Sequence, residues 1–361
     1  MPNKDKSQKI VSKNVVIFTK TLWNEPPRLR HQLSKMLSSY GHTITFFEKT
    51  MFKPSKTKNY VKNIINLIRH YEFLHHQLKP FGILIKLNQL VVKYFIEKNT
   101  KSNDIDLIIN FNYDYDFLKE LFPDVRIVTI INDDFVAQAK PWMRNAIKMQ
   151  LESTCRKSDV VFTVSYFLEE QLRNYTKNVQ LLLPWADREY IEIKRNNPKK
   201  ILIWGYITPR YDFSMIESVA LTFPEYTINI IGGIHKSISS TLYKLLDKYK
   251  NIVYSTPKNL DDIDLNNYFV CFAPYNLSEE TKAISITNKS FQVFARGLAM
   301  VNHGMPNFIE KSFIANCKNI KEVHSAIQEC REGQIKYQIE LKSFVNSNQE
   351  QDRYNVIKKI F

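Results

Sequence analysis

The chain has 361 residues, 44% of them hydrophobic, and this globular composition excludes an intrinsically disordered protein. The length exceeds the usual size of one hydrophobic core, so we expect two domains. Lysine and arginine number 51 against 36 acidic residues, and the net charge of +15 favours phosphorylated substrates, an anionic membrane surface or nucleic acid as partners.

The first residues and the cysteines indicate the compartment. Residues 1–9 contain no apolar segment, so we do not expect them to form a signal peptide. No stretch reaches the roughly 18 uncharged apolar residues that a membrane-spanning helix needs. The four cysteines are far apart and lack metal-ligand spacing, as expected for reduced thiols. We therefore expect a cytoplasmic protein, soluble or peripheral at the inner face of a membrane.

Short apolar runs alternate with helical patterns along the first half. Residues 15–18 are rich in β-branched side chains, as a buried parallel strand is. A helical spacing of leucines follows and ends at Gly41. Further strands are predicted at 43–47, 106–111, 126–131, 159–163 and 179–183.

The polar, proline-containing stretch 196–200 is interpreted as an interdomain linker. The alternation then restarts, with strands predicted at 201–204, 227–231, 252–254, 268–272 and 298–301. Strands that alternate with helices imply a parallel sheet covered on both faces. The sequence therefore predicts an α/β protein with two Rossmann-like domains, 1–195 and 199–335, and a terminal helical segment, 336–361.

Residues 49–101 depart from this pattern. They contain eleven lysines or arginines, opposed only by Glu72 and Glu97, with apolar residues such as Val61, Ile65 and Leu67 between the charges. A basic amphipathic helix of this kind can lie on an anionic membrane surface. An ordinary solvated helix face fits the pattern equally well.

Two segments of the second half, 205–213 and 272–297, resemble the donor half of GT-B glycosyltransferases of bacterial polysaccharide and capsule assembly. In many of these, a Pro-Leu-Lys-x-Phe-Glu-Tyr-x-Ala-x-Gly stretch opens the helix under the nucleotide sugar. Gln292 stands where retaining members carry Glu, and a Gln here resembles the xanthan-type glucuronosyltransferase branch, which inverts. Four positions match the motif: Lys289, Phe291, Ala295 and Gly297.

The first half resembles the same enzymes at 23–32 with 41–42, and at 130–135, 165–173 and 183–187. The resemblance implies a GT-B fold, with two parallel sheets facing a central cleft and a last helix that packs back on the first domain. It also implies metal-independent transfer of a sugar from a nucleotide sugar, most commonly a UDP-sugar, to a glycan or lipid-linked acceptor in cell-surface polysaccharide synthesis. The nucleotide sugar is a substrate, and no cofactor is expected.

A negatively charged diphosphate is bound well by the N–H groups of a helix N-terminus together with a fixed cation. Lys289, beside Asn288 and Ser290 at a predicted helix start, is our first choice for that contact. Arg210 is a second cation, unless the segment is a simple turn with a solvated arginine. The other donor-binding candidates are Gly205, Tyr206, Gly232, Tyr254, Ser255, Glu280 and Gln292.

Inversion needs a base that takes the proton from the attacking acceptor hydroxyl. Asp133 and Asp134 follow the strand predicted at 126–131, at the end where α/β sheets bind ligands. One of them should serve structure, and we slightly prefer Asp133 as the base; the alternative is that both are turn residues. His31 is a further candidate, although a lone helical histidine is more often packed. No metal-ligand motif is found.

Three other interpretations remain open. A nucleotide-sugar 2-epimerase shares the two-domain architecture but needs more acidic and histidine residues in the cleft. A GT-B scaffold without activity is compatible with the missing acid at Gln292. A nucleic-acid-binding protein is suggested by the charge, but no helix-turn-helix, RNA-binding aromatic motif or zinc module is present, so no nucleic acid is expected as a partner.

Overall fold

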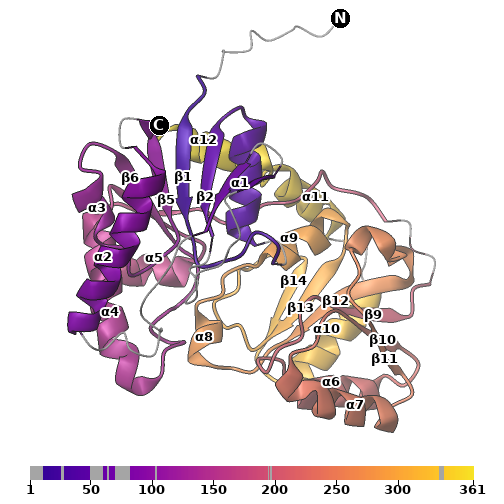
Figure 1. Ribbon diagram of the computed structural model, residues 1–361. Coiled ribbons are helices and arrows are strands. Elements are labelled where there is room, and N and C mark those ends of the chain that lie inside the picture. The colour runs from indigo at the N-terminus through magenta and orange to yellow at the C-terminus, as the bar shows by residue number, and fades with distance from the viewer. Residues whose placement is uncertain are drawn as a thin grey trace, which may run out of the picture. The chain divides into compact units, whose positions relative to one another are not determined.

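The structure is a computed structural model that describes residues 11–25, 28–48, 60–62, 65–69, 82–101, 104–193, 195, 197–332 and 337–361 (Figure 1). Contacts along the chain divide it into two compact units, which are described separately. Unit 1 comprises Met1–Val164, Leu168–Leu182 and Tyr354–Phe361, and unit 2 comprises Ser165–Phe167 and Leu183–Arg353. The domain limits expected near 195 and 336 stay predictions; by contacts, residues 183–195 and 338–353 group with unit 2.

Unit 1 is built on an eight-stranded sheet in the order β3-β4-β2-β1-β5-β6-β7-β8, in which β3 alone is antiparallel to its neighbour. The central strands are almost wholly buried, which explains their continuous apolar sequences. The strands are β1 (Asn14–Phe18), β2 (Thr43–Phe47), β3 (Tyr60–Lys62), β4 (Ile65–Ile68), β5 (Leu107–Asn110), β6 (Arg126–Ile131), β7 (Val160–Thr163) and β8 (Val179–Leu181).

Helices cover this sheet because each presents an apolar stripe. Val92 and Ile96 of α2 pack in one cluster with Val16, Phe18 and Ile108. The alternate residues of β1 point to the other face. The helices are α1 (Leu29–Ser39), α2 (Gly82–Asn99), α3 (Leu118–Leu121), α4 (Arg144–Lys157), α5 (Tyr166–Leu172) and α12 (Glu350–Lys358), with a 3₁₀ turn at Pro141–Met143.

The sequence interpretation of the basic region was wrong at 60–68. We expected an amphipathic helix there, but the described residues form β3 and β4, and β4 pairs in parallel with β2. Ile65, Leu67 and Ile68 are buried in the sheet. A short run of apolar, β-branched residues favours a strand over a helix, and here the run is buried in the sheet as a strand.

Unit 2 contains a six-stranded, fully parallel sheet in the order β11-β10-β9-β12-β13-β14. The strands are β9 (Lys200–Trp204), β10 (Thr227–Ile231), β11 (Ile252–Ser255), β12 (Tyr268–Pro274), β13 (Ala299–His303) and β14 (Ile314–Cys317). The helices are α6 (Phe213–Thr222), α7 (Ser239–Lys248), α8 (Glu279–Lys282), α9 (Asn288–Ala295), α10 (Ile320–Glu332) and α11 (Gln338–Asn346), with 3₁₀ turns at Lys236–Ile238, Leu260–Asp262 and Leu265–Asn267.

In both sheets the strand order reverses beside the first strand, between β1 and β5 and between β9 and β12. Ligands of open α/β sheets bind outside the carboxyl ends of strands at such a switch point. The loop after β9 and the segment that leads from β12 into α9 both start at this place in unit 2. The topology therefore directs attention to Gly205 and to the start of α9.

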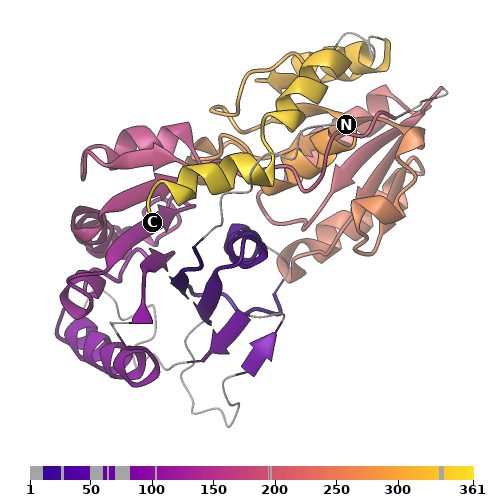
Figure 2. The ribbon, with the colours of Figure 1, turned by 90° about the horizontal axis from the view of Figure 1, so that it is seen from above.

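The end of the chain forms two helices where one was predicted. The break between α11 and α12 includes Gln349, whose N–H donates to Asp352 Oδ2 at 2.8 Å. In unit 1, the Tyr354 ring stacks on Tyr40 with centroids 3.7 Å apart, and its hydroxyl lies 3.0 Å from His42 Nε2. These contacts hold the last residues of the chain on unit 1 (Figure 2).

Candidate functional site

Two glycine turns meet at the carboxyl end of the unit 2 sheet. Gly205 has φ +112° and Gly232 has φ +159°, values that residues with a side chain rarely adopt. The Gly205 N–H donates to Ile231 O at 2.9 Å and the Gly232 N–H donates to Ser255 O at 3.1 Å. A Cβ on Gly232 would lie 1.7 Å from the carbonyl oxygen of Gly205. The structure thus brings Gly205, Gly232 and Ser255, three of the predicted donor residues, into adjacent positions, and only glycine fits at the two turns.

Lys289 reaches these turns from the second residue of α9. Its side chain passes so close to Gly205 that a Cβ there would lie 2.4 Å from Lys289 Cδ. The ammonium donates to the hydroxyl oxygens of Tyr211 and Tyr275, at 3.3 and 3.4 Å. Burial lowers the pKa of Lys289, but the two phenol oxygens raise it more, so its pKa lies above the ordinary value. Within the described chain no carboxylate pairs with this cation.

The start of α9 offers further polar groups. Thr287 caps the helix, since its Oγ1 accepts the Ser290 N–H at 3.1 Å. The side-chain oxygen of Asn288 is buried and makes no hydrogen bond. A small cavity beside these residues is lined by Trp204, Tyr211, Tyr275, Thr287, Lys289 and Ser290. A helix N-terminus and a fixed cation in one place suit a phosphate-bearing ligand.

Two other predicted donor residues bind each other. Arg210 Nη2 and Glu280 Oε2 lie 2.5 Å apart in an ion pair that is more than one-third exposed on the arginine side. The carbonyl oxygen of Arg210 also accepts the Asn276 N–H at 2.7 Å, which ties the loop after β9 to the segment after β12. Arg210 is therefore a partly exposed cation that is paired with Glu280, and any phosphate would compete with Glu280 for it.

The remaining donor candidates have varied positions. Tyr206 is 54% exposed and lies beside Gly233. The Tyr254 hydroxyl donates to Gly232 O at 2.9 Å, so this tyrosine supports the turn, and burial raises its pKa. Gln292 lies three residues beyond Lys289 on α9 and is partly buried.

A buried arginine that we did not predict supports the same helix. Arg296, at the end of α9, is 5% exposed and binds Asp187 with two contacts, at 2.9 and 3.0 Å, and Asp261 at 3.0 Å. Burial alone would lower its pKa, but these carboxylates raise it. Both Asp187 and Arg296 lie in segments that carried the family resemblance, and that was the only sequence signal for the pair.

The acidic turn of unit 1 follows β6, as predicted, and its two carboxylates have different surroundings. Asp134 Oδ1 accepts the Ala137 N–H at 2.8 Å and so closes the turn. Asp133 instead accepts from side-chain amides, Asn132 Nδ2 at 2.6 Å and Gln138 Nε2 at 3.3 Å. Asp134 therefore has a structural role in the turn, whereas two of the contacts of Asp133 come from side-chain amides.

His31 is held on both nitrogens by the backbone. The Arg28 N–H donates to Nδ1 at 3.1 Å, so Nε2 carries the hydrogen and donates to Leu22 O at 3.2 Å. The ring is buried against Trp23 and Phe46, and burial lowers its pKa. In this arrangement neither nitrogen can accept a proton from a substrate, and His31 closes the loop that precedes α1.

Arg30 is a second cation that sequence reasoning missed. It is 8% exposed, its Nη1 donates to Thr19 Oγ1 at 3.2 Å, and its guanidinium lies 5.5 Å from the centre of the Phe111 ring. Burial and the charge of Arg28 lower its pKa to about 10, although Asp133 and Glu25 act in the opposite direction. The group is still charged at neutral pH, and it forms no ion pair with a described carboxylate.

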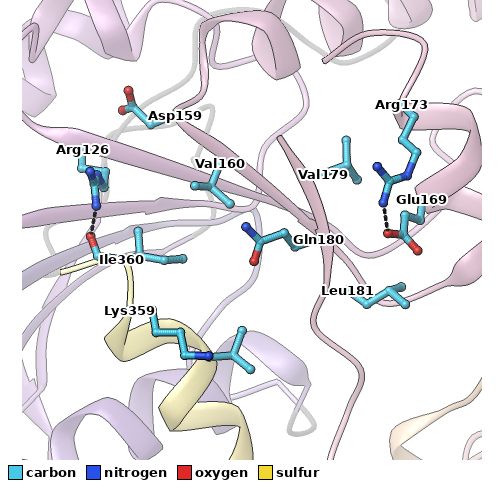
Figure 3. Close-up of a pocket in the computed structure, with 11 residues that line it drawn as sticks. Arg126, Asp159, Val160, Glu169, Arg173, Val179, Gln180, Leu181, Lys359 and Ile360 are labelled. Carbon is cyan, nitrogen blue, oxygen red and sulfur yellow. Dashed lines mark hydrogen bonds and ion pairs between the residues drawn. The ribbon is translucent and has the colours of Figure 1, made fainter. Parts of the chain in front are cut away.

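A wider hollow of about 750 Å³ lies at the other end of the unit 1 sheet (Figure 3). The first residues of β6, β7 and β8 line it together with the chain's last residues, and Arg126 Nη1 donates to Ile360 O at 2.6 Å. Arg173 and Glu169 pair with each other at its rim, 2.6 Å apart. The hollow lies opposite the strand ends that carry Asp133, and Val356, Lys359 and Ile360 form part of its wall.

Neither a metal-binding cluster nor a membrane-spanning helix is found among the described residues. No group of three or more His, Cys, Asp or Glu side chains is placed to hold a metal ion in that part of the chain. None of the helices that the structure describes is both long enough and apolar enough to span a bilayer.

Known proteins resemble this chain in structure but not in sequence. No protein-family model matches the sequence, and a search of curated proteins finds no significant match. Solved structures match over almost their whole length. Sucrose-phosphate synthase from Thermosynechococcus elongatus superposes with a TM-score of 0.70 at 12% identity, covering 96% of this chain and 98% of that one.

Two further solved structures match this chain over a similar length and at similarly low identity. HepE of Anabaena, solved in complex with UDP and glucose, has a TM-score of 0.65 at 9% identity and covers 96% of this chain and 98% of its own. WaaG, a glycosyltransferase involved in lipopolysaccharide biosynthesis, has a TM-score of 0.64 at 10% identity, with 96% and 99% covered. The expected fold class is thereby confirmed: the chain has the GT-B fold.

Proposed function

We propose that the protein is a glycosyltransferase that takes a sugar from a nucleotide-sugar donor. The observation that carries this proposal is the cation of Lys289, held by two tyrosine hydroxyls against the Gly205 turn at the start of α9. A cation without a carboxylate partner at a helix N-terminus is suited to the diphosphate that leaves when the glycosidic bond breaks. The GT-B fold, and the UDP and glucose bound to HepE, support UDP as the nucleotide.

The proposed reaction is metal-independent and inverting. Asp133 would take the proton of the acceptor hydroxyl as that oxygen attacks the sugar, while Lys289 stabilises the charge that develops on the departing diphosphate. Gln292, at the position where retaining relatives carry Glu, supports inversion and the resemblance to the xanthan-type glucuronosyltransferase branch. The proposed acceptor is a glycan or lipid-linked glycan of cell-surface polysaccharide synthesis, met at the inner face of the membrane.

The first test is a thermal-shift screen of the purified chain against nucleotides and nucleotide sugars. A ligand that binds only the folded state raises the melting temperature by mass action. We expect a rise with one nucleotide family, strongly reduced in Lys289→Ala. Lys282→Ala is the matched control, since that lysine is in the same segment but pairs with Glu279 at 2.6 Å.

Each outcome of the screen has a meaning. If no nucleotide shifts the folded protein, the donor site is rejected. If Lys289→Ala and Lys282→Ala respond like the wild type, a nucleotide binds elsewhere. If UDP binds but no UDP-sugar is turned over with any acceptor, the chain is a GT-B scaffold without activity.

A further inference from the structure

The outward face of α2 carries a row of large apolar side chains. Ile83, Leu87, Leu90 and Tyr94 are 76, 47, 61 and 58% exposed. Their spacing of four, three and four residues places them on one stripe of the helix. Single exposed apolar residues are ordinary, but a continuous stripe marks a surface that is covered by something.

The opposite face of α2 is firmly seated in unit 1, so the exposed stripe is not a misplaced core. Val92 and Ile96 are fully buried in the cluster beneath the helix. Polar contacts fix the flanks, Gln89 Nε2 to Asp116 Oδ1 at 3.0 Å and Lys93 Nζ to Glu120 Oε2 at 3.1 Å. The register of the helix is therefore determined, and the exposed stripe lies on the side of α2 opposite Val92 and Ile96.

The charges beside the stripe have a small positive excess. Lys86 and Lys98 are exposed on the same side of α2, and so is Glu97, the one acidic residue of the helix. The neighbouring helix α4 also bonds to Asp116, through Ser153 Oγ at 2.7 Å. Its exposed residues repeat the pattern of apolar and basic side chains: Trp142 just before it, then Arg144, Lys148 and Met149.

We propose that this surface, Ile83, Leu87, Leu90 and Tyr94 of α2 with the lysines beside them, binds the headgroup region of a bilayer that contains anionic lipids. Apolar side chains on a basic helix lie at the boundary between headgroups and acyl chains, and each lysine adds attraction to anionic lipid. A second copy of the chain is a poorer occupant, because the same lysines would face each other across the interface. The proposal is independent of the donor chemistry and names where the protein meets lipid.

The test is co-sedimentation of the full chain with vesicles of phosphatidylcholine alone and of phosphatidylcholine with phosphatidylglycerol. We expect binding to the anionic vesicles, weakened by salt and about tenfold or more weaker for the zwitterionic ones. The double variant Leu87→Gln/Leu90→Gln should lose about tenfold or more of the binding. The matched control is Leu221→Gln on α6, since Leu221 is 61% exposed, as Leu90 is, but lies in unit 2.

The outcomes separate the possible occupants. Binding lost in Lys86→Gln/Lys98→Gln as well as in the leucine variant supports the proposal, because both parts of the surface are then needed. It is overturned if the folded wild type ignores anionic vesicles, or if the leucine variant binds them like Leu221→Gln. A dimer in solution that the leucine variant converts to a monomer would assign the stripe to a second copy. Nucleotide thermal shifts on the same samples report the donor site separately.

Discussion

Lys289 lies directly over the Cα of Gly205, and a Cβ at position 205 would fall 2.4 Å from its Cδ and 2.9 Å from its Nζ. Real Cβ atoms are never that close to a neighbouring side chain, so Gly205→Ala must displace the ammonium. The positive φ of Gly205 adds backbone strain of about 1 kcal/mol or more. We expect nucleotide affinity, measured by calorimetric titration, to fall about tenfold or more.

Gly233→Ala is the control for that substitution. A Cβ there would lie 3.0 and 3.2 Å from Cδ2 and Cε2 of the exposed Tyr206 ring, which can move aside, and at an ordinary contact distance of 3.8 Å from Pro257 Cγ. This variant should keep its nucleotide affinity. Equal affinities for the two alanine variants would mean that the position of Lys289 does not matter for binding.

Substitution of Asp133 should lower the rate of sugar transfer, whereas substitution of Asp134 should lower stability. Asp133→Asn keeps the shape of the side chain but removes the base, so we expect the rate of sugar transfer to fall about 10²–10⁴-fold with little change in melting temperature. Asp134→Ala removes the acceptor for the Ala137 N–H and should cost about 1 kcal/mol of unfolding free energy. Transfer assays and denaturant unfolding of both variants check this pair. The reverse pattern would assign the base to Asp134.

We predict that the buried charge of Arg30 lowers the stability of the fold but contributes to acceptor binding. Its buried guanidinium has one hydrogen bond and no carboxylate partner among the described residues. Replacing a buried charge by an apolar side chain of similar size is often neutral or stabilising. We therefore expect Arg30→Met to keep or raise the melting temperature while the acceptor KM rises. A lower melting temperature with unchanged kinetics would make Arg30 a structural residue only.

The sequence predicted strands well where local signal and burial agree. Three strands have the same first and last residues as predicted: 43–47, 126–131 and 227–231. A short apolar run rich in β-branched residues between polar turns is typical of a buried strand. β14 was not predicted, since Ile314–Cys317 is only four residues long, contains the exposed polar Asn316 and lies at the sheet edge. β3 and β4 were predicted as helix because lysines between apolar residues fit both the 3.6-residue period of a helix and the 2-residue period of a strand.

Within the candidate site, only the part with a local pattern was predictable. Lys289 and Gly205 were named because motif residues surround each of them, and the fold brings them together. The bond between Arg210 and Glu280 was not expected, although both residues were candidates. Arg296 finds its partners Asp187 and Asp261 in distant segments, and no spacing in one sequence indicates such a pair.

Two buried histidines should make the protein sensitive to mild acid. His42 Nδ1 accepts the Lys13 N–H at 3.2 Å, just as His31 Nδ1 accepts that of Arg28, so both rings are neutral in the fold. Burial lowers the pKa of each; for His42 the charge of Lys13 acts with burial and Asp106 opposes it. Protonation of either Nδ1 would break the bond from the backbone.

The sign of the effect follows from these lowered values. The unfolded chain binds a proton at each histidine near pH ~6.5, whereas the folded chain resists it until a lower pH. Stability is therefore complete above pH ~6.5 and falls as the pH drops toward the folded pKa values. We expect the melting temperature to decrease from neutral pH toward pH ~5, with a shallower decrease in His42→Gln, whose side chain cannot titrate. A flat wild-type melting temperature over this range would mean that folding does not lower the histidine pKa values, and a rise toward acid would mean that folding raises them. Either result would contradict the acceptor role of both Nδ1 atoms.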